Sequence, residues 1–580
     1  MYTDYEIRQI PLSLKPARTK VERFLGDNGL RIDSLDYYAG VFRLDSDEMV
    51  AGGGLCGDVI KCVAVDPALR DEALTNRLVS HLMSVAAGEG HMLVKLFTKP
   101  ANKTVFRSLG FRLLAESPQA VFMEIGPDGI ESYLTYLRGL RREGSGAAIV
   151  MNANPFTLGH RYLIEEASRR CGTLYVIAVR EERSQFSYAE RLAMIKAGCR
   201  DLANVVVCEG SGYAVSADTF PSYFLKKIDD ATDTHITLDL DIFATHIAPA
   251  LGVTERFVGS EPDDRLTARY NEMMRTLLPG KGIAVTEIDR LHSGNAPVSA
   301  SAVRRALADG SLLRAAALVS PATVPHLIAS LAVAALRSEI DVTPKPGLVD
   351  RHDSGAHTDM DHALMSRSID ALHPYFLRLA RMGYGEVLPQ AGDLAEVGKE
   401  GEAAMLRATS GVNTHRGALF AVGLAVTAAA HCYYTRSTVT PQELRTRIME
   451  LAGGFAPPEQ THGWEVRSRY GVGGASAHAR AGYPGLFSRW LPFYSEHRDD
   501  ENADLKTLLA IMTELDDTNI YFRCGPEAVA KVKQEAGALL ENFSVSALED
   551  MNRRFSAERI SPGGAADMLS LTILIYSLTH

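Results

Sequence analysis

Strand and helix patterns alternate along the first 326 residues of this chain, and beyond them the strand patterns stop. Short apolar runs such as "GAAIVMNA" and "TLYVIAVR" are typical of buried strands, and amphipathic helical stretches separate them. Strands that are separated by helices predict right-handed β–α–β units and a parallel sheet. The Ala- and Leu-rich stretches that follow predict a region built only of helices.

A length of 580 residues is too great for one hydrophobic core and predicts about three to four domains. We place the start of the helical region at "LVSPATVPHL", residues 318–327, which holds two prolines. The chain is therefore expected to be a multidomain protein. The expected domains are a mixed α/β domain over residues 1–145, an α/β domain with a Rossmann-like parallel sheet over 146–326, and an all-α domain over 327–580.

Charge and composition favour a cytoplasmic protein that binds neither nucleic acid nor a membrane. The net charge of −10 is the opposite of the basic surface that nucleic-acid binding needs. The seven cysteines include no CxxC pair, and the start "MYTDYEIRQI" lacks the pattern of a signal peptide. The longest apolar run, residues 417–434, falls short of the about 20 residues that span a bilayer, so we expect a buried helix there.

The stretch "NANPFTLGHRYLIEEA", residues 152–167, places a turn between an apolar strand and a helix. Ligands of open parallel sheets bind at the carboxyl ends of the strands, and a helix N-terminus attracts phosphate. Gly159 would let a nucleotide approach the backbone, while Thr157 and His160 would donate hydrogen bonds to it. The same residues could instead form a simple turn with a histidine that caps the helix.

A second stretch, "VSASAVRRAL" at residues 298–307, brings two hydroxyl groups and a guanidinium to another helix start. These groups suit phosphate oxygens, although Ser299, Ser301 and Arg304 could also be an ordinary helix cap and its neighbours. In "FVGSEPDD", residues 257–264, Asp263 and Asp264 could contact a nucleotide or belong to a solvated loop.

Taken together, the two stretches resemble the HxGH-type nucleotidyltransferase superfamily in its T-x-G-H form. Such enzymes attack the α-phosphate of ATP, form an adenylate and release pyrophosphate, with Mg²⁺ to neutralise charge. The resemblance implies a catalytic role for His160 and a clamp on the leaving group by the residues of the second stretch. The nucleotide- and phosphate-binding residues it implies are Asn154, Thr157, Gly159, His160, Ser299, Ser301 and Arg304.

The N-terminal region resembles a GNAT-type acetyltransferase fold in "VAVDPALRDEALTNRLVSHLM" and "VFRSLGF". That family holds coenzyme A with a glycine-rich loop, but residues 70–75 contain no glycine and two acids, which favours a structural or docking role. A GNAT-like region before the two phosphate motifs resembles the citrate lyase ligase family over residues 1–326. The resemblance implies activation of acetate as acetyl-AMP and acetylation of a thiol on the acyl carrier subunit of citrate lyase.

Polar stretches interrupt the helical region at residues 341–368, 411–420, 514–525 and 560–576. Polar groups at the ends of buried helices are costly unless they are paired or used, so these stretches predict a site for a Mg²⁺–polyphosphate. Asp359 and Asp361 could reach one cation at a helix entry, or they could be capping acids of a solvated loop.

The stretches "TPKPGLVDRHDSGAHTDMD", "GVNTHRGALFAVG", "GVGGASAHAR" and "SPGGAADMLSLT" resemble the triphosphoribosyl-dephospho-CoA synthase family. The resemblance implies the substrates ATP and dephospho-CoA and the release of adenine through an oxocarbenium-like state. It assigns Lys345, Arg351, His415 and Arg416 to phosphates. It assigns Asp359, Asp361, Asp516 and Asp517 to Mg²⁺ or to the developing cation, with Asp359 and Asp361 as catalytic candidates.

The two resemblances predict one bifunctional enzyme that prepares citrate lyase for activity. Two alternatives stay open. The nucleotidyltransferase region could adenylate another substrate, as pantetheine-phosphate and nicotinate-type relatives do. The chain could also be a scaffold in which one or both sites are inactive and which docks the carrier subunit.

Overall fold

The computed structural model describes residues 4–69, 72–181, 184–213, 228–262, 264–294, 296–456 and 462–580. The chain divides into two compact units. The first comprises the residues up to Asn154 together with Gly159–Pro297, and the second comprises Pro155–Leu158 and Val298–His580.

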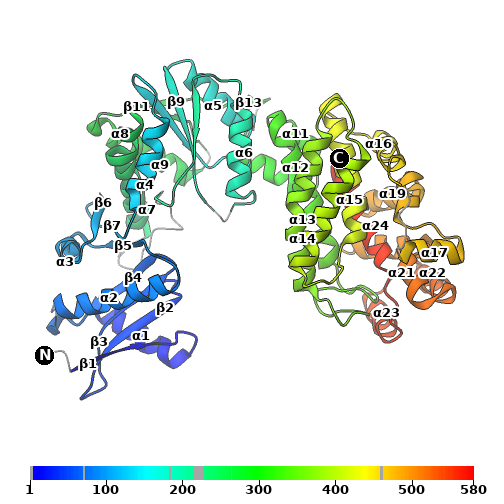
Figure 1. Cartoon of the computed structure of the whole chain (residues 1–580), viewed down its shortest axis with the longest axis horizontal. Coiled ribbons are helices and arrows are strands. Elements are labelled where there is room, and N and C mark those ends of the chain that lie inside the picture. The colour runs from blue at the N-terminus through cyan, green and yellow to red at the C-terminus, as the bar shows by residue number, and fades with distance from the viewer. Residues whose placement is uncertain are drawn as a thin grey trace. The chain divides into compact units, whose positions relative to one another are not determined.

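The first unit begins with a mixed sheet in the order β1-β2-β3-β4-β5-β7-β6 (Figure 1). Only β4 and β5 run parallel, and the other neighbours are antiparallel. Side chains alternate between the two faces, so that α1 packs on one face and α2 on the other. The elements are β1 (Tyr5–Gln9), α1 (Lys15–Asp27), β2 (Tyr37–Arg43), β3 (Met49–Cys56), β4 (Val59–Val65), α2 (Glu72–Gly88), β5 (Val94–Thr98), α3 (Lys103–Ser108), β6 (Arg112–Glu116) and β7 (Val121–Ile125).

A second sheet in the first unit has the order β10-β9-β8-β11-β12, and all of its strands are parallel. This confirms the predicted parallel sheet. The chain leaves β8 toward β9 on one side and later returns to β11 on the other, which makes the β8/β11 gap the switch point where ligands bind in such sheets. The elements are α4 (Gly129–Leu140), β8 (Gly146–Met151), α5 (Leu158–Ser168), β9 (Thr173–Ala178), α6 (Tyr188–Gly198), β10 (Val205–Cys208), α7 (Ile228–Ile242), α8 (Ala248–Leu251), β11 (Val253–Gly259), α9 (Arg265–Leu277), β12 (Ala284–Ile288), β13 (His292–Ser293) and β14 (Ala296–Pro297).

The two sheets of the first unit share one hydrophobic core. Phe97 and Phe122 of the mixed sheet belong to the same buried cluster as Ile236 and Leu240 of α7. Hydrogen bonds also cross between the two regions; for example, the Tyr213 hydroxyl donates to Glu124 Oε2 at 2.6 Å. The predicted domain ranges 1–145, 146–326 and 327–580 stay a prediction about which parts fold separately.

Arg191 fixes the loops that leave the centre of the parallel sheet. Its side chain is fully buried and donates to Asn152 O at 2.8 Å, Asn152 Oδ1 at 2.6 Å, Val179 O at 2.9 Å and Glu181 O at 2.6 Å. These acceptors follow β8 and β9 at their carboxyl ends. One guanidinium therefore satisfies the carbonyl groups of two loops that no sheet partner reaches.

Beyond Val324, the described residues of the second unit contain helices and no strand, which confirms the predicted all-α region (Figure 1). The α-helices of the second unit, two of which precede Val324, are α10 (Ala300–Ala308), α11 (Leu312–Ala316), α12 (Val324–Asp341), α13 (His362–Gly383), α14 (Ala391–Ala408), α15 (Arg416–Arg436), α16 (Pro441–Gly453), α17 (His462–Tyr470), α18 (Ala475–Arg480), α19 (Leu491–His497), α20 (Ala503–Glu514), α21 (Thr518–Cys524), α22 (Pro526–Glu541), α23 (Val545–Ala557) and α24 (Gly563–Thr579).

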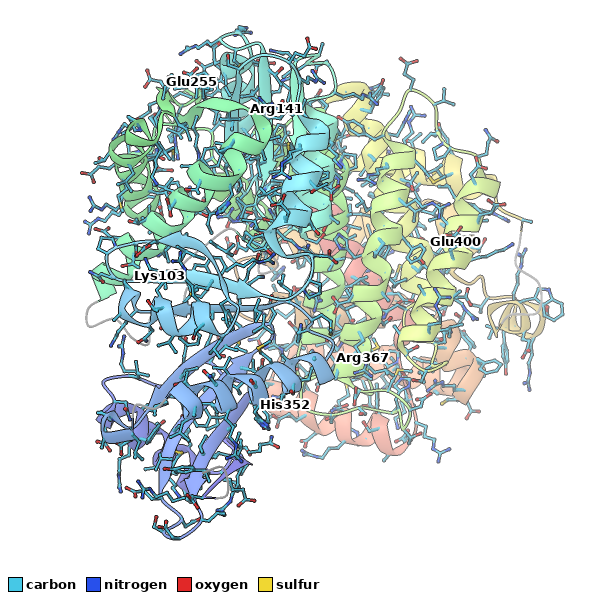
Figure 2. All side chains as sticks on the ribbon, turned by 60° about the vertical axis from the view of Figure 1, so that its left-hand side comes forward. Lys103, Arg141, Glu255, His352, Arg367 and Glu400 are labelled. Carbon is cyan, nitrogen blue, oxygen red and sulfur yellow. The ribbon has the colours of Figure 1, made fainter. Side chains whose placement is uncertain are left out.

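Helix α15 lies at the centre of the helical region. It is long and apolar enough to cross a bilayer by composition, but 83% of its most apolar window is buried inside the protein, as the buried-helix prediction requires. Small residues allow neighbouring helices to approach it closely: a Cβ atom at Gly383 of α13 would collide with the Thr427 carbonyl of α15. Charged side chains such as Arg367 on α13 and Glu400 on α14 remain on the exposed sides of their helices (Figure 2).

Replacing Arg191 by methionine should lower the free energy of unfolding of the first unit by about 3 kcal/mol, because several buried carbonyl groups lose their donor. Both tryptophans of the chain lie in the second unit. Urea unfolding followed by circular dichroism should therefore show an earlier transition that tryptophan fluorescence does not share. The exposed Arg200→Met, just after the end of α6, is the matched control and should shift neither transition.

Candidate functional site

The second unit contains a cavity of about 1010 Å³. Five polar segments line it, although they are far apart in the sequence. They are residues 341–368, 411–420, 471–480, 514–525 and 560–570. The long helices α15 and α24 both begin at this cavity, so the positive ends of two helix dipoles face it. The arrangement suits a ligand with several negative charges.

Lys345 lines the cavity and is only 1% exposed. Its ammonium group forms an ion pair with Glu339 of α12 and donates to the Glu339 carbonyl at 2.8 Å. The predicted phosphate-binding lysine is thus already paired with a buried acid. Glu339 lies in none of the predicted polar stretches. The signal for it is one glutamate within a strongly apolar helix, because a buried charge is costly unless it is paired.

His415 lines the same cavity from the residue before α15. Its Nδ1 is 2.8 Å from Ser368 Oγ, which accepts a hydrogen bond from the Thr414 hydroxyl at 2.7 Å. Its buried Nε2 has no hydrogen-bond partner among the described residues. Burial and the nearby charge of Lys345 lower the pKa of His415 to about 3. If the Ser368 hydroxyl donates to Nδ1, the neutral ring keeps its proton on Nε2, where it is free for a ligand.

Two carboxyl groups, one buried and one half-buried, lie at the start of α21 and in the first turns of α24. Asp517 is 3% exposed and accepts hydrogen bonds from the amides of Asn519 at 2.8 Å and Ala565 at 3.1 Å. Burial raises the pKa of Asp517 to about 6. Burial and the charges of Glu339 and Asp517 raise the pKa of Asp567 well above its ordinary value. Asp567 also lines the cavity. It belongs to the predicted polar stretch 560–576, but the resemblance assigned it no role.

The glycines of two predicted motifs make room for these acids. A Cβ atom at Gly417 would collide with the carboxylate of Asp567, and one at Gly564 would lie 3.0 Å from the carboxylate of Asp517. The motifs "GVNTHRGALF" and "SPGGAADML" therefore need glycine where the backbone lies against a carboxyl group.

The remaining predicted residues of the helical region divide into two groups. Asp359, Arg416 and Asp516 line the cavity. Arg416 forms an ion pair with Glu402, and Asp516 pairs with Lys533 at 2.7 Å.

Arg351 and Asp361 are absent from the described cavity lining. Arg351 is exposed and pairs with Asp341 at 2.7 Å. Asp361 caps α13 by accepting from the Leu364 amide at 2.7 Å. Asp359 and Asp361 therefore do not face one common site, because the carboxylate of Asp361 caps helix α13.

The described residues hold no group of three or more His, Cys, Asp or Glu side chains that could bind a metal ion by themselves. Mg²⁺ is commonly held by one or two carboxylates together with substrate phosphates and water. The carboxyl groups of Asp516 and Asp517 fit that kind of binding, in which a bound nucleotide completes the coordination.

In the first unit, His160 lies in the first turn of α5, just after the carboxyl end of the central strand β8. Burial and the nearby charge of Arg290 lower the pKa of His160 to about 4, so the imidazole is neutral at physiological pH. Arg290 donates to Ser260 O at 2.7 Å, at the end of β11. Arg290 also forms an ion pair with Glu261. The β8/β11 switch point thus combines a neutral histidine with a cation that already has an acidic partner.

The loop after β8 is held in an uncommon conformation. Ala153 has a φ of 49°, in the left-handed region that non-glycine residues seldom adopt. Asn154 Oδ1 accepts from the Phe186 amide at 3.2 Å. Strained residues of this kind are concentrated at functional sites.

The other half of the predicted nucleotidyltransferase site belongs to the second unit. Thr157 forms an isolated antiparallel backbone bridge with Val319, which lies within the stretch 318–327. Ser299 caps α10 by accepting from the Ala302 amide at 3.1 Å, and Arg304 donates to Ser301 Oγ at 3.0 Å. Gly159 and His160 belong to the first unit, so a single site made of both halves stays a prediction.

The two acids of "FVGSEPDD" differ in what the structure describes of them. Asp264 caps α9 by accepting from the Thr267 amide at 2.7 Å. Asp263, as well as Arg70 and Asp71 of the loop without glycine, lie outside the described residues.

Comparison with known proteins gives two family matches. Residues 146–327 match the citrate lyase ligase C-terminal domain, and residues 325–580 match the ATP:dephospho-CoA triphosphoribosyl transferase family. Among solved structures, a pantothenate synthetase from Thermus thermophilus is 13% identical with a TM-score of 0.22, over 47% of this chain and 80% of that chain. That similarity is too low to bear on the fold.

Curated relatives match each half of the chain. The [citrate [pro-3S]-lyase] ligase of Klebsiella pneumoniae is 39% identical over 320 residues, which are 54% of this chain and 93% of that protein. The corresponding ligase of Escherichia coli K12 is 38% identical over 53% of this chain and 89% of its own length. A probable 2-(5''-triphosphoribosyl)-3'-dephosphocoenzyme-A synthase of Pseudomonas fluorescens Pf0-1 is 40% identical over 44% of this chain and 92% of that protein.

Gly417→Ala should destabilise the helical region by about 1–3 kcal/mol, because the new methyl group collides with the carboxylate of Asp567. Urea unfolding monitored by tryptophan fluorescence measures this change. Gly392→Ala is the matched control: Gly392 is also the second residue of its helix, and an added Cβ there meets nothing within 4 Å. An equal change in the free energy of unfolding for both substitutions would contradict the contact between residue 417 and Asp567.

His415 should make the helical region less stable as the pH falls. The unfolded chain takes up a proton near the ordinary histidine pKa of about 6.5, whereas the folded chain does so only near the lowered pKa, so stability is lost below pH 6.5. Between pH 7.5 and 5.5, His415→Gln should flatten the decline of the unfolding midpoint. The exposed His352→Gln is the control, and an identical slope in both variants would argue against a buried neutral His415.

Proposed function

Because the chain belongs to the citrate lyase ligase family and, over residues 325–580, to the triphosphoribosyl-dephospho-CoA synthase family, we propose that it is one bifunctional enzyme that prepares citrate lyase for activity. It combines a ligase with a triphosphoribosyltransferase. In the proposed sequence of events, the helical region makes the precursor of the prosthetic group. The N-terminal half acetylates that group once another enzyme has attached it to the acyl carrier subunit of citrate lyase.

The helical region is proposed to transfer the triphosphoribosyl unit of ATP to dephospho-CoA. The bond between the ribose C1 and adenine breaks, and a bond forms between this carbon and the 2′-hydroxyl oxygen of dephospho-CoA. The hydroxyl proton goes to a base, and the adenine leaves with a proton. The observation that carries this proposal is the convergence of five polar segments on one cavity that offers both cations and buried carboxyl groups.

Each kind of group in the cavity has a proposed part. Lys345, His415 and Arg416 bind the triphosphate, and the dipoles of α15 and α24 support them. A carboxylate of Asp517 or Asp567 stabilises the positive charge that develops on the ribose in an oxocarbenium-like state. Mg²⁺, when bound near Asp516 and Asp517, would neutralise part of the triphosphate charge.

The N-terminal half is proposed to activate acetate. The acetate oxygen attacks the α-phosphate of ATP and pyrophosphate leaves, after which the carrier thiol takes the acetyl group from acetyl-AMP and AMP leaves. Neutral His160, together with Thr157, contacts the phosphates, and Ser299, Ser301 and Arg304 hold the leaving pyrophosphate. The neutral imidazole of His160 beside the cation Arg290 supports this assignment, since both can donate to phosphate oxygens.

Adenylation of another acid by the same residues is the competing function for this half. Pyrophosphate exchange into ATP separates the two possibilities. Exchange that depends on acetate supports the ligase, and exchange that depends on a different acid supports the alternative.

The two activities should be separable by mutation. His160→Ala should reduce acetate-dependent ATP–pyrophosphate exchange by about 100-fold or more and leave adenine release from ATP and dephospho-CoA unchanged. Asp517→Asn should reduce adenine release and leave acetate-dependent ATP–pyrophosphate exchange unchanged. Chromatography of free adenine, together with the mass of the triphosphoribosyl product, measures the second reaction.

The exposed Asp499→Asn is the control for the second substitution and should retain both activities. In each of the two variants, the activity of the unmutated half should be retained, which shows that the chain is folded. Loss of both activities in a variant that unfolds like the wild type would contradict independent sites.

A further inference from the structure

Two large aromatic side chains are exposed on the lining of the helical cavity. Trp464 of α17 is 45% exposed and Phe522 of α21 is 41% exposed. The two helices pack against each other, with the rings of Tyr470 and Tyr521 at a centroid distance of 5.4 Å. Tryptophan and phenylalanine side chains at a cavity leave apolar area in contact with water when no ligand covers them. Such side chains are typical of ligand contacts.

Two arginines accompany these rings. Arg467 lies three residues after Trp464 in α17, so both occupy the same side of the helix, and Arg523 directly follows Phe522. Both arginines line the cavity. The charge of Arg523 contributes to the lowered pKa of His357, another lining residue, so the guanidinium lies close to the cavity wall. Neither arginine forms an ion pair with a described acidic residue.

A second aromatic pair lines the same cavity in a less exposed position. The rings of Phe420 and Phe455 meet edge to face, with centroids 5.5 Å apart and planes at 86°. Both side chains are half-buried. The cavity volume of about 1010 Å³ lies at the upper end of the range for small-molecule sites. Two aromatic platforms in one large cavity match a reaction whose two substrates each carry an adenine ring.

We propose that Trp464, Phe522, Arg467 and Arg523 form a subsite for the acceptor nucleotide, with the rings stacked on the adenine of dephospho-CoA and the arginines bound to its pyrophosphate. This inference rests on the proposed triphosphoribosyl transfer. The donor needs the enclosed part of the cavity, where Lys345, His415 and the buried acids can surround its triphosphate and reacting carbon. The acceptor carries a long pantetheine arm, which requires an open position. Two exposed guanidinium groups match the two negative charges of a pyrophosphate diester.

The chain contains only two tryptophans, which makes binding directly observable. Trp490 is 5% exposed and donates to Glu514 Oε2 at 3.2 Å, away from the described cavity lining. In a Trp490→Phe variant, Trp464 is the one remaining emitter. Saturable quenching of its fluorescence by dephospho-CoA, at concentrations at least tenfold below those of ATP that give the same change, is the expected result.

Two results of this titration would overturn the proposal. One is an unchanged spectrum at dephospho-CoA concentrations that saturate turnover. The other is full quenching by ATP alone at the lower concentrations, which would assign the rings to the donor. The titration measures binding and not turnover. It therefore tests the subsite even if the wild-type chain releases no adenine and the proposed reaction itself fails.

Steady-state kinetics provide the matched test. Trp464→Ala and Arg467→Ala should each raise the KM for dephospho-CoA about tenfold, whereas kcat and the KM for ATP should change less than twofold. Arg469→Ala on the same helix and Tyr434→Ala, an equally exposed aromatic residue, are the controls, since neither lines the cavity. An unchanged KM for dephospho-CoA in both cavity variants, or a rise that is confined to ATP, would refute the subsite.

Discussion

The structure of the helical region depends on the enclosure of charged groups beside two of its most apolar helices. A buried ion costs several kcal/mol unless it is paired, so each charge near α15 and α24 needs a partner within the protein. Lys345 has Glu339, and the Asp517 carboxylate has two amides. Among the described residues, the Nε2 of His415 has no hydrogen-bond partner, and burial together with the charges of Glu339 and Asp517 raises the pKa of Asp567. Unfinished compensation of this kind lowers stability, and a bound ligand can restore it.

The same constraint explains the small residues of the region. Helices that bring polar groups to one buried point must approach one another closely, and glycine is the residue that permits it. Gly383 admits the Thr427 carbonyl between α13 and α15, while Gly417 and Gly564 admit the two carboxyl groups. The packing of the helices and the chemistry of the cavity are therefore two results of one requirement.

The first unit meets a comparable requirement with a different device. There the loops after β8 and β9 have buried carbonyl groups without sheet partners, and Arg191 supplies donors to both. With the loop fixed, Ala153 can keep a left-handed conformation and α5 can begin beside the sheet. Both proposed reactions then use ATP at the start of a helix. In the adenylation, acetate attacks the α-phosphate. In the triphosphoribosyl transfer, the triphosphate stays whole and the bond between ribose and adenine breaks.

The sequence by itself determined the succession of fold classes and the segments that form the cavity. The spacing of apolar residues distinguishes a strand from a helix within a short segment. Glycine, proline and polar residues mark the places where the apolar helices are interrupted. Which side chains reach the cavity was decided by the tertiary structure. Asp361 and Arg351 belong to a predicted segment, yet one caps α13 and the other pairs with Asp341. Glu339 stood in an apolar helix with no motif around it, and Asp567 stood beyond a glycine turn. Nearness along a chain does not fix the direction of a side chain, because that direction depends on which face of each helix its neighbours cover.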